Sequence, residues 1–189
     1  SLAHLLASAV LKIYPSTKVT IGPAIDNGFY YDFDFAEPIN EKDLGKIEQK
    51  MREISKSWDG FTAKEVSREE ALEFFKDNPY KIELINEIAA KGEKITLYTS
   101  GDFTDLCRGG HVDSMKNVDM KGLKLYRIAG AYWRGDEKNK MLTRIYGLAF
   151  SNKEELEAYE LQQKEAEKRD HRKLGKELDI FEFNEDVGA

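Results

Sequence analysis

The sequence contains a single cysteine, Cys107, among its 189 residues. Without a second cysteine no disulfide can form within the chain, and such sparing use is typical of a reducing cytoplasm. No stretch approaches the ~18 consecutive apolar residues that a membrane-spanning helix needs, so we expect no membrane partner. The first residues also lack the basic flank of a secretory signal, and we therefore expect a cytoplasmic protein.

A net basic charge is missing as well, because 29 Lys and Arg stand against 35 Asp and Glu. The resulting net charge of −6 argues against a protein that coats nucleic acid in general. The charge is nevertheless uneven, since residues 116–144 hold eight basic and three acidic residues. This basic stretch, which includes Lys124, Arg127 and Arg134, suits contact with one polyanionic feature, although an ordinary solvated face has the same composition.

Hydrophobic periodicity predicts an α+β fold. Apolar residues cover most of the circumference of a helix over residues 2–14, so we expect this helix to be buried. Strand patterns lie at residues 19–21, 29–35, 61–66, 95–99, 123–129 and 142–150, and further helices are expected at 40–58, 67–76 and 79–90. We expect an antiparallel sheet packed around the buried helix, with residues 100–113 forming a structured loop.

The last part of the chain predicts a different kind of element. One long helix is expected from residue 151 to about 178, and its middle, residues 164–176, is nearly all charged. Such a helix has no broad face to bury, so it bridges domains or projects into solvent. We therefore expect one domain at residues 1–150, followed at 151–189 by a connector helix and the start of a linker.

Cys107 and His111 are the residues most suited to chemistry. A Cys-x-x-x-His pair brings a thiolate and an imidazole to one small site, which could bind zinc or activate water. Between them, Gly109 and Gly110 allow positive φ, and their amides could donate to an anion or an ester oxygen. On spacing alone, however, the pair also fits a structural loop. Other single residues likewise have ordinary interpretations: His4 as a core histidine, Lys81 as a surface lysine and His171 as a solvated helix residue.

Five stretches, taken together, resemble one known family. They are Ala-His-Leu-Leu at 3–6, Ile-Gly-Pro-Ala-Ile-Asp-Asn-Gly-Phe-Tyr-Tyr-Asp at 21–32, Asp-Leu-Cys-Arg-Gly-Gly-His at 105–111, Ala-Gly-Ala-Tyr-Trp-Arg-Gly-Asp at 129–136 and Lys-Arg-Asp-His-Arg-Lys-Leu-Gly at 168–175. The combination resembles the editing domain of bacterial-type threonyl-tRNA synthetases along essentially the whole chain. The related alanyl-tRNA synthetase editing domains share the His-x-x-x-His and Cys-x-x-x-His plan, but are not expected to share residues 26–32.

The resemblance implies hydrolysis of serine mischarged on tRNA(Thr). It implies catalytic roles for His4, Lys81, Asp105, Cys107 and His111, with Tyr31 as a pocket wall and Gly109 and Gly110 binding substrate. No cofactor is expected to be required, although His4, Cys107 and His111 could hold zinc. The acceptor end of tRNA(Thr) is the implied partner, contacted by Lys124, Arg127 and Arg134. The full-length enzyme is expected to be a homodimer whose class II catalytic domain, absent from this chain, holds ATP and its own zinc.

Two departures from the family pattern bear on the site. The first histidine of the helix motif should lie four residues before His4, ahead of Ser1, and Gly110 takes a position that is often proline. A free-standing deacylase acting in trans and a non-catalytic zinc- or RNA-binding module stay open as alternatives. The choice between a histidine base and the 2′-hydroxyl of the tRNA also stays open.

Overall fold

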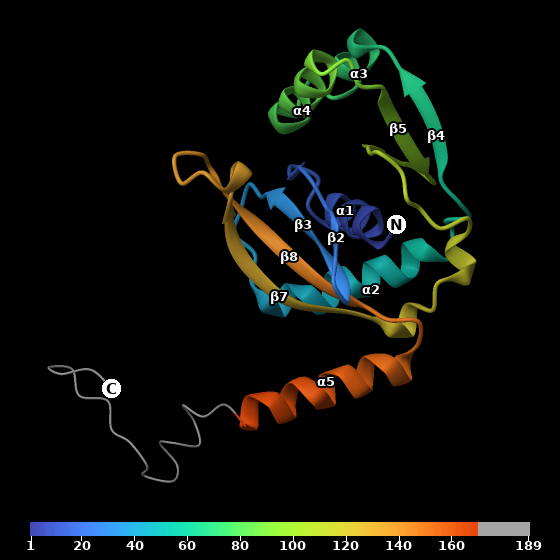
Figure 1. Cartoon of the computed structure of the whole chain (residues 1–189), viewed down its shortest axis with the longest axis vertical. Helices are drawn as coiled ribbons and strands as arrows, with labels where there is room; N and C mark the ends of the chain where they lie inside the picture. The colour runs from blue at the N-terminus through green and yellow to red at the C-terminus, as the bar shows by residue number, and fades with distance from the viewer. Residues whose placement is uncertain (170–189) are drawn as a thin grey trace, which may run out of the picture.

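Two antiparallel sheets organise the chain in this computed structural model, which describes residues 1–169 (Figure 1). The larger sheet has the order β1–β3–β8–β7, with β2 also beside β3; the smaller has the order β4–β5–β6. The larger sheet is formed by β1 (Lys18–Val19), β2 (Ala24–Ile25), β3 (Gly28–Asp34), β7 (Leu123–Tyr132) and β8 (Met141–Ala149). The smaller is formed by β4 (Thr62–Val66), β5 (Ile95–Ser100) and β6 (Phe103–Leu106). The predicted α+β class is confirmed.

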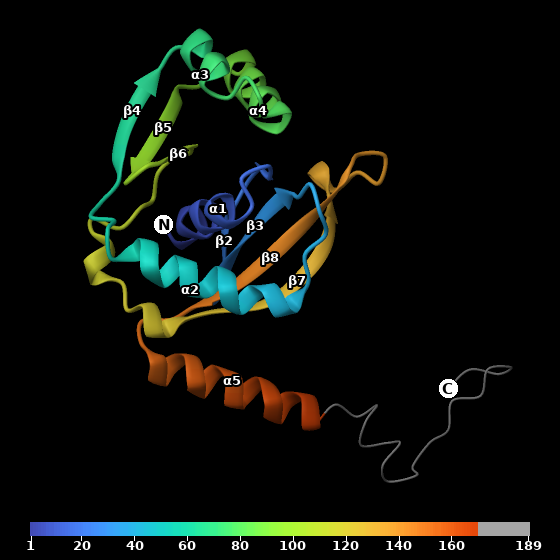
Figure 2. The ribbon, with the colours of Figure 1, turned by 180° about the vertical axis from the view of Figure 1, so that it is seen from behind.

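Helix α1 (Leu2–Ile13) is buried along residues 3–10, as its apolar periodicity predicts. Together with α2 (Leu44–Ser55) it covers one face of the larger sheet, and we call this assembly the large lobe (Figure 2). On β3, Tyr31 and Phe33 join the core. Asp32, between them, instead accepts hydrogen bonds from Arg144 of β8 at 2.7 and 2.8 Å. Aromatic and acidic side chains of this strand therefore lie on opposite faces of the sheet.

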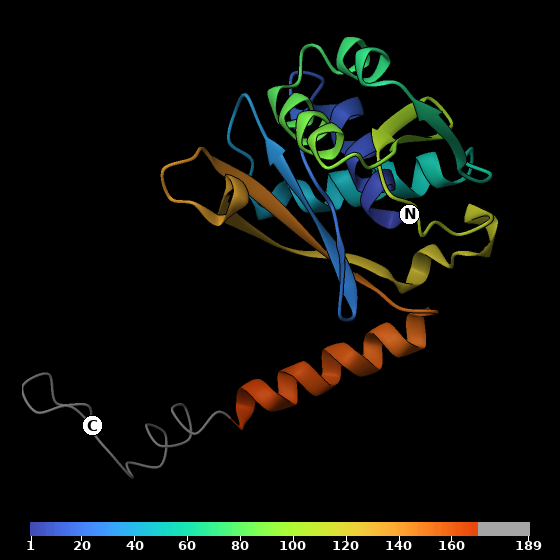
Figure 3. The ribbon, with the colours of Figure 1, turned by 45° about the horizontal axis from the view of Figure 1, so that its top comes forward.

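The small lobe combines β4, β5 and β6 with α3 (Arg68–Phe74) and α4 (Pro79–Ala90). A separate apolar cluster holds it together, formed by Ala71, Phe75, Ile85, Ile95 and Leu97. Ser67 and Glu70 form the capping box that opens α3, with the Glu70 amide donating to the Ser67 hydroxyl. This lobe lies beside the N-terminal end of α1, at the opposite end of the molecule from α5 (Figure 3).

One expected element needs correction, and another is described only in part. Residues 103–106 form β6, where the sequence predicts only a loop, because Gly101, at φ +57°, closes a tight hairpin after β5. The long helix is found as α5 (Lys153–Lys168), and Asn152 caps it by accepting from the Glu155 amide at 2.9 Å. Its expected continuation to residue 178, including His171, lies outside the described residues. The division of the chain at residue 150 stays a prediction.

No helix among residues 1–169 is both long enough and apolar enough to cross a membrane.

Candidate active site

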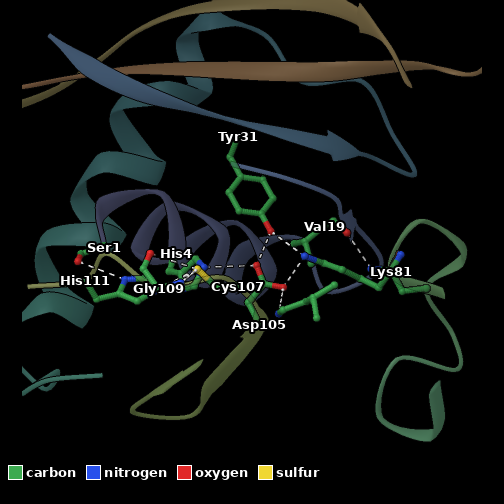
Figure 4. A network of polar contacts seen from close by, with 11 residues as sticks. Ser1, His4, Val19, Tyr31, Lys81, Asp105, Cys107, Gly109 and His111 are labelled. Carbon is green, nitrogen blue, oxygen red and sulfur yellow. Dashed lines mark hydrogen bonds and ion pairs between the residues drawn. The ribbon is translucent and has the colours of Figure 1, made fainter. Parts of the chain in front are cut away.

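The candidate active site lies where the two lobes meet (Figure 4). The large lobe contributes His4 from α1 and Tyr31 from β3. The small lobe contributes Lys81 from the first turn of α4, Asp105 from β6, and the loop from Cys107 to His111 that follows β6. The structure therefore brings all five expected catalytic residues to one place, although more than 100 positions separate the first from the last.

Asp105 is the centre of a buried polar network. Its Oδ1 accepts from the Leu106 amide at 2.8 Å and forms an ion pair with Lys81 Nζ. Its Oδ2 accepts from the Tyr31 hydroxyl at 2.6 Å and lies 3.7 Å from His4 Nε2. The side chains of Lys81 and Asp105 are only 1% and 2% exposed. A buried charge needs a partner, and here each one supplies the other's.

Local sequence explains how a lysine reaches this buried position. Pro79 occupies the first turn of α4, and the Asn78 side chain accepts from the Lys81 amide at 3.3 Å. The other end of that side chain donates to the Val19 carbonyl of the large lobe at 2.8 Å. Asn78 therefore caps the helix and fixes its first turn against the opposite lobe. The interpretation of Lys81 as a surface residue, which α4 alone suggested, is wrong.

Tyr31 does not lie where a pocket wall is expected. It is 1% exposed, and its ring lies directly behind Gly22, where a Cβ atom would collide with it. Burial, and secondarily the Asp105 charge, raise the pKa of Tyr31 well above its usual value. The hydroxyl therefore stays protonated and donates a hydrogen bond to the carboxylate. The tyrosine thus orients Asp105 from behind.

His4, Cys107 and His111 form a second cluster beside this network. Their ligand atoms all lie within 4.8 Å of one another, and Cys107 Sγ is 3.3 Å from His111 Nε2. The His111 ring stacks on Phe61 with centroids 4.0 Å apart. His4 Nδ1 is buried without a hydrogen-bond partner among the described residues. A buried, unpartnered ring nitrogen on a member of this cluster is suited to binding a water molecule or an ion.

Burial lowers the pKa values of both His4 and His111 from 6.5 to about 4. Both imidazoles are therefore neutral near pH 7, and each has a nitrogen lone pair that can accept from water or bind a metal. A base of pKa about 4 removes a proton from water poorly at neutral pH, so these rings are better suited to orienting the water.

The donor set is also suited to zinc. Zinc bound at ~2.0–2.3 Å in tetrahedral geometry places its ligand atoms roughly 3.3–3.8 Å apart. The separation of Cys107 and His111 already fits, and His4 needs a small movement. These three residues would leave the fourth position to water or another ligand. That no metal is required stays a prediction.

The loop carrying Cys107 and His111 uses its two glycines as expected. Gly109 has φ +108° and Gly110 has φ +81°, both in the region that favours glycine. This turn directs the Gly109 amide to Cys107 Sγ at 3.3 Å. A Cβ atom at Gly109 would also press on the Tyr98 hydroxyl.

Two cavities meet at this cluster. The first, of about 430 Å³, extends from His4 and Cys107 between Lys81 and Leu84 of α4 and residues 20–23. The second, of about 420 Å³, extends from the same two residues along the 107–112 loop towards Gly28. Both volumes suit a small molecule or the end of a larger one. Gly22 and Pro23 line both cavities, and their place in the 21–32 motif is the signal that could have identified them.

The basic stretch, residues 116–144, is less exposed to partners than its sequence suggests. Five of its eight basic side chains pair with carboxylates from other parts of the fold: Lys116 with Asp59, Lys124 with Glu160, Arg134 with Glu83 and Glu87, Lys140 with Asp34, and Arg144 with Asp32. Arg127 lies over the Tyr146 ring, 5.7 Å from its centroid, and has no carboxylate partner within residues 1–169. Contact of Lys124, Arg127 and Arg134 with tRNA stays a prediction.

Comparisons with known proteins agree with the resemblance. A family described as "Threonyl and Alanyl tRNA synthetase second additional domain" matches residues 95–146, which include Asp105, Cys107 and His111. The threonine–tRNA ligase of Borrelia hermsii is 56% identical over 188 residues, covering 100% of this chain and 32% of the ligase. Those of Borrelia turicatae and Borreliella burgdorferi are 55% and 53% identical over the same shares. The chain is therefore similar to threonyl-tRNA synthetases along its whole length. It spans about a third of the length of these ligases, and that third includes the additional domain.

Proposed function

We propose that this chain is an editing domain that hydrolyses the ester between serine and tRNA(Thr). The observation that carries the proposal is the buried Lys81–Asp105 pair beside the cluster of His4, Cys107 and His111, where two cavities meet. Both histidines of this cluster are neutral near pH 7. Strongly perturbed titratable groups in a cavity are typical of catalytic sites. The similarity to proteins named threonine–tRNA ligases suggests the substrate class.

In the proposed reaction, water attacks the ester carbonyl carbon, the bond to the tRNA ribose oxygen breaks, and that oxygen takes up a proton. His4 and His111 orient the water by accepting its hydrogen bonds. The low pKa of both rings favours the 2′-hydroxyl of the tRNA as the group that relays the proton. Of the two loop glycines expected to bind substrate, Gly109 already donates its amide to Cys107 Sγ, so the Gly110 amide is the candidate to stabilise the developing oxyanion. Asp105 is positioned to bind the amino group of serine, and Lys81 the ribose or the ester.

Selectivity follows from size. Threonine exceeds serine by one methyl group, and one pocket discriminates such a group by only ~1–3 kcal/mol. An aminoacylation site built for threonine therefore accepts some serine, and a second site is needed to hydrolyse the mischarged product. The editing site must admit serine while the extra methyl group of threonine collides or displaces the attacking water. With Tyr31 behind Gly22, the walls that can act in this way are Gly22, Pro23 and the 107–111 loop.

The remaining expectations for the whole enzyme join this proposal. They are contact with the acceptor end of tRNA(Thr), a class II catalytic domain with ATP and zinc elsewhere in the full-length chain, a homodimeric enzyme and a cytoplasmic location. The chain covers 32% of its relatives, which leaves room for such a domain.

Separate assays of Ser-tRNA(Thr) and Thr-tRNA(Thr) test the proposal, with this chain and with a version extended upstream to include the motif's first histidine. We expect hydrolysis of the serine ester and sparing of the threonine ester. Equal rates on both would contradict selective editing. No hydrolysis of either ester by both versions would favour the non-catalytic zinc- or RNA-binding module.

A further inference from the structure

The tip of the β7–β8 hairpin, residues 133–140, is fastened to α4 by polar contacts. Trp133 Nε1 donates to Glu83 Oε2 at 2.9 Å. Arg134 Nε lies 2.5 Å from Glu83 Oε1, and Nη2 of the same guanidinium group lies 2.5 Å from Glu87 Oε1. One arginine therefore bridges two carboxylates that are one turn apart on the helix, a task suited to its rigid fork of donors.

Apolar packing strengthens the same contact. Tyr80, Trp133 and Leu142 form a cluster of their own, separate from the cores of the two lobes, with Leu84 packed against it. The Tyr80 and Trp133 rings meet edge to face with centroids 5.1 Å apart. Tyr80 also donates to Asp34 of β3 at 2.8 Å, so α4 is joined to the larger sheet at both strand β3 and the hairpin tip.

The backbone of the tip is held in an uncommon conformation. Arg134 has φ +57°, one of only two positive values found at non-glycine residues in the described part of the chain. A residue with a side chain is strained in this region, and the conformation persists where surrounding contacts hold it. Here the conformation lets the guanidinium reach back to Glu83 and Glu87.

Helix α4 is also the element that presents Lys81 to Asp105, and Leu84 and Glu87 of the same helix line the first cavity. Figures 1 and 3 show α4 on the side of the small lobe that is turned towards the β7–β8 hairpin. Any shift of this helix against the sheet therefore moves Lys81 and one side of the cavity together.

We propose that the hairpin tip is a latch that holds α4 and so positions Lys81, with Trp133, Arg134, Glu83 and Glu87 as positioning residues. The proposal rests on the ester hydrolysis proposed above for its kinetic consequence. It also replaces the expected role of Arg134 in binding tRNA, because its Nε and Nη2 are already paired with carboxylates of α4.

The test compares Arg134→Ala with the double variant Glu83→Gln, Glu87→Gln, which opens the latch from the other side. Lys50→Ala is the matched control, since Lys50 is 33% exposed against 34% for Arg134 and pairs with Glu53 on α2, far from the site. Hydrogen exchange of α4 amides and the kcat and KM for Ser-tRNA(Thr) are measured for each. Arg134→Lys should lie between Arg134→Ala and the unaltered chain.

We expect both latch variants to speed exchange in α4 about tenfold or more, with α1 amides unchanged. We also expect kcat to fall about tenfold while KM stays within twofold, and Lys50→Ala to leave all these values unchanged. The latch would be overturned if KM rose for Arg134→Ala, fell for the double variant, and hydrogen exchange in α4 stayed unaltered in both. Arg134 would then be a phosphate contact. If the unaltered chain hydrolyses no ester, the proposed function fails, while unaltered exchange in the variants would still refute the latch itself.

Discussion

Replacing Lys81 by methionine tests the energetics of the buried network. The change removes the ammonium but keeps most of the side-chain volume, so it leaves Asp105 as a charge that is 2% exposed and has lost its ion-pair partner. Breaking a buried pair in this way destabilises proteins by about 3–5 kcal/mol. Asp105 keeps its hydrogen bonds from Tyr31 and Leu106, which argues for the lower end, about 3 kcal/mol.

Urea unfolding followed by the fluorescence of Trp58 and Trp133 measures this loss. A domain of ordinary stability, about 5–15 kcal/mol, stays folded after it. Asp105→Asn alone should be similarly destabilising, because it leaves the ammonium unpaired. The double variant Lys81→Met, Asp105→Asn buries no charge and should recover at least half of the loss. It should nevertheless fail to hydrolyse Ser-tRNA(Thr), which separates the pair's chemical role from its structural one.

Two results would refute this reasoning. One is a loss below about 1 kcal/mol for Lys81→Met, which would mean that water or another cation reaches Asp105. The other is a double variant as unstable as the sum of the two single variants, which would mean that the residues do not interact.

Three further predictions follow from the electrostatics. The pKa of His4 is about 4 in the folded state and 6.5 when unfolded, so the unfolded state binds the extra proton between these values. Proton uptake at His4 alone should therefore lower stability by about 3 kcal/mol as the pH falls from 6.5 to 4, and His4→Gln should make this part of the urea-midpoint profile less steep, leaving the contribution of His111. Prolonged chelation should leave ester hydrolysis intact; a loss that only zinc restores would contradict this. Arg127→Glu should weaken tRNA binding and its salt dependence more than Lys124→Glu, because Glu160 already neutralises Lys124; equal effects on the salt slope would count against it.

The fold was largely predictable because its elements carry strong local signals. The burial of α1 follows from apolar residues around most of its circumference, and α3 begins at the capping box that Ser67 and Glu70 predict. Strand β6 was missed because four residues that pair only with β5 carry too short a pattern. Its existence depends on the hairpin closed at Gly101, and pairing of this kind is a tertiary effect that sequence periodicity does not record.

The site was predictable only through the resemblance. Nothing local distinguishes Lys81 from a surface lysine, because its burial depends on Asp105, 24 positions away, and on docking of α4 against the other lobe. The charges of residues 116–144 misled for the same reason, since their partners come from distant segments. Gly110 illustrates a further limit. Its φ of +81° is closed to proline, so family loops with proline at this position must follow a different backbone path.

The pairing of Lys81 with Asp105 itself argues for chemistry at this junction. Buried ion pairs contribute little net stability, and apolar residues of similar volume often replace them without loss. Here the two charges lie on different elements of the small lobe, and Tyr31 reaches their carboxylate from the large lobe. A core that served stability alone would have no need of this arrangement at the wall of a cavity. A site that must bind the amino group of an ester and a ribose has such a need, because it requires opposite charges held rigidly and shielded from water.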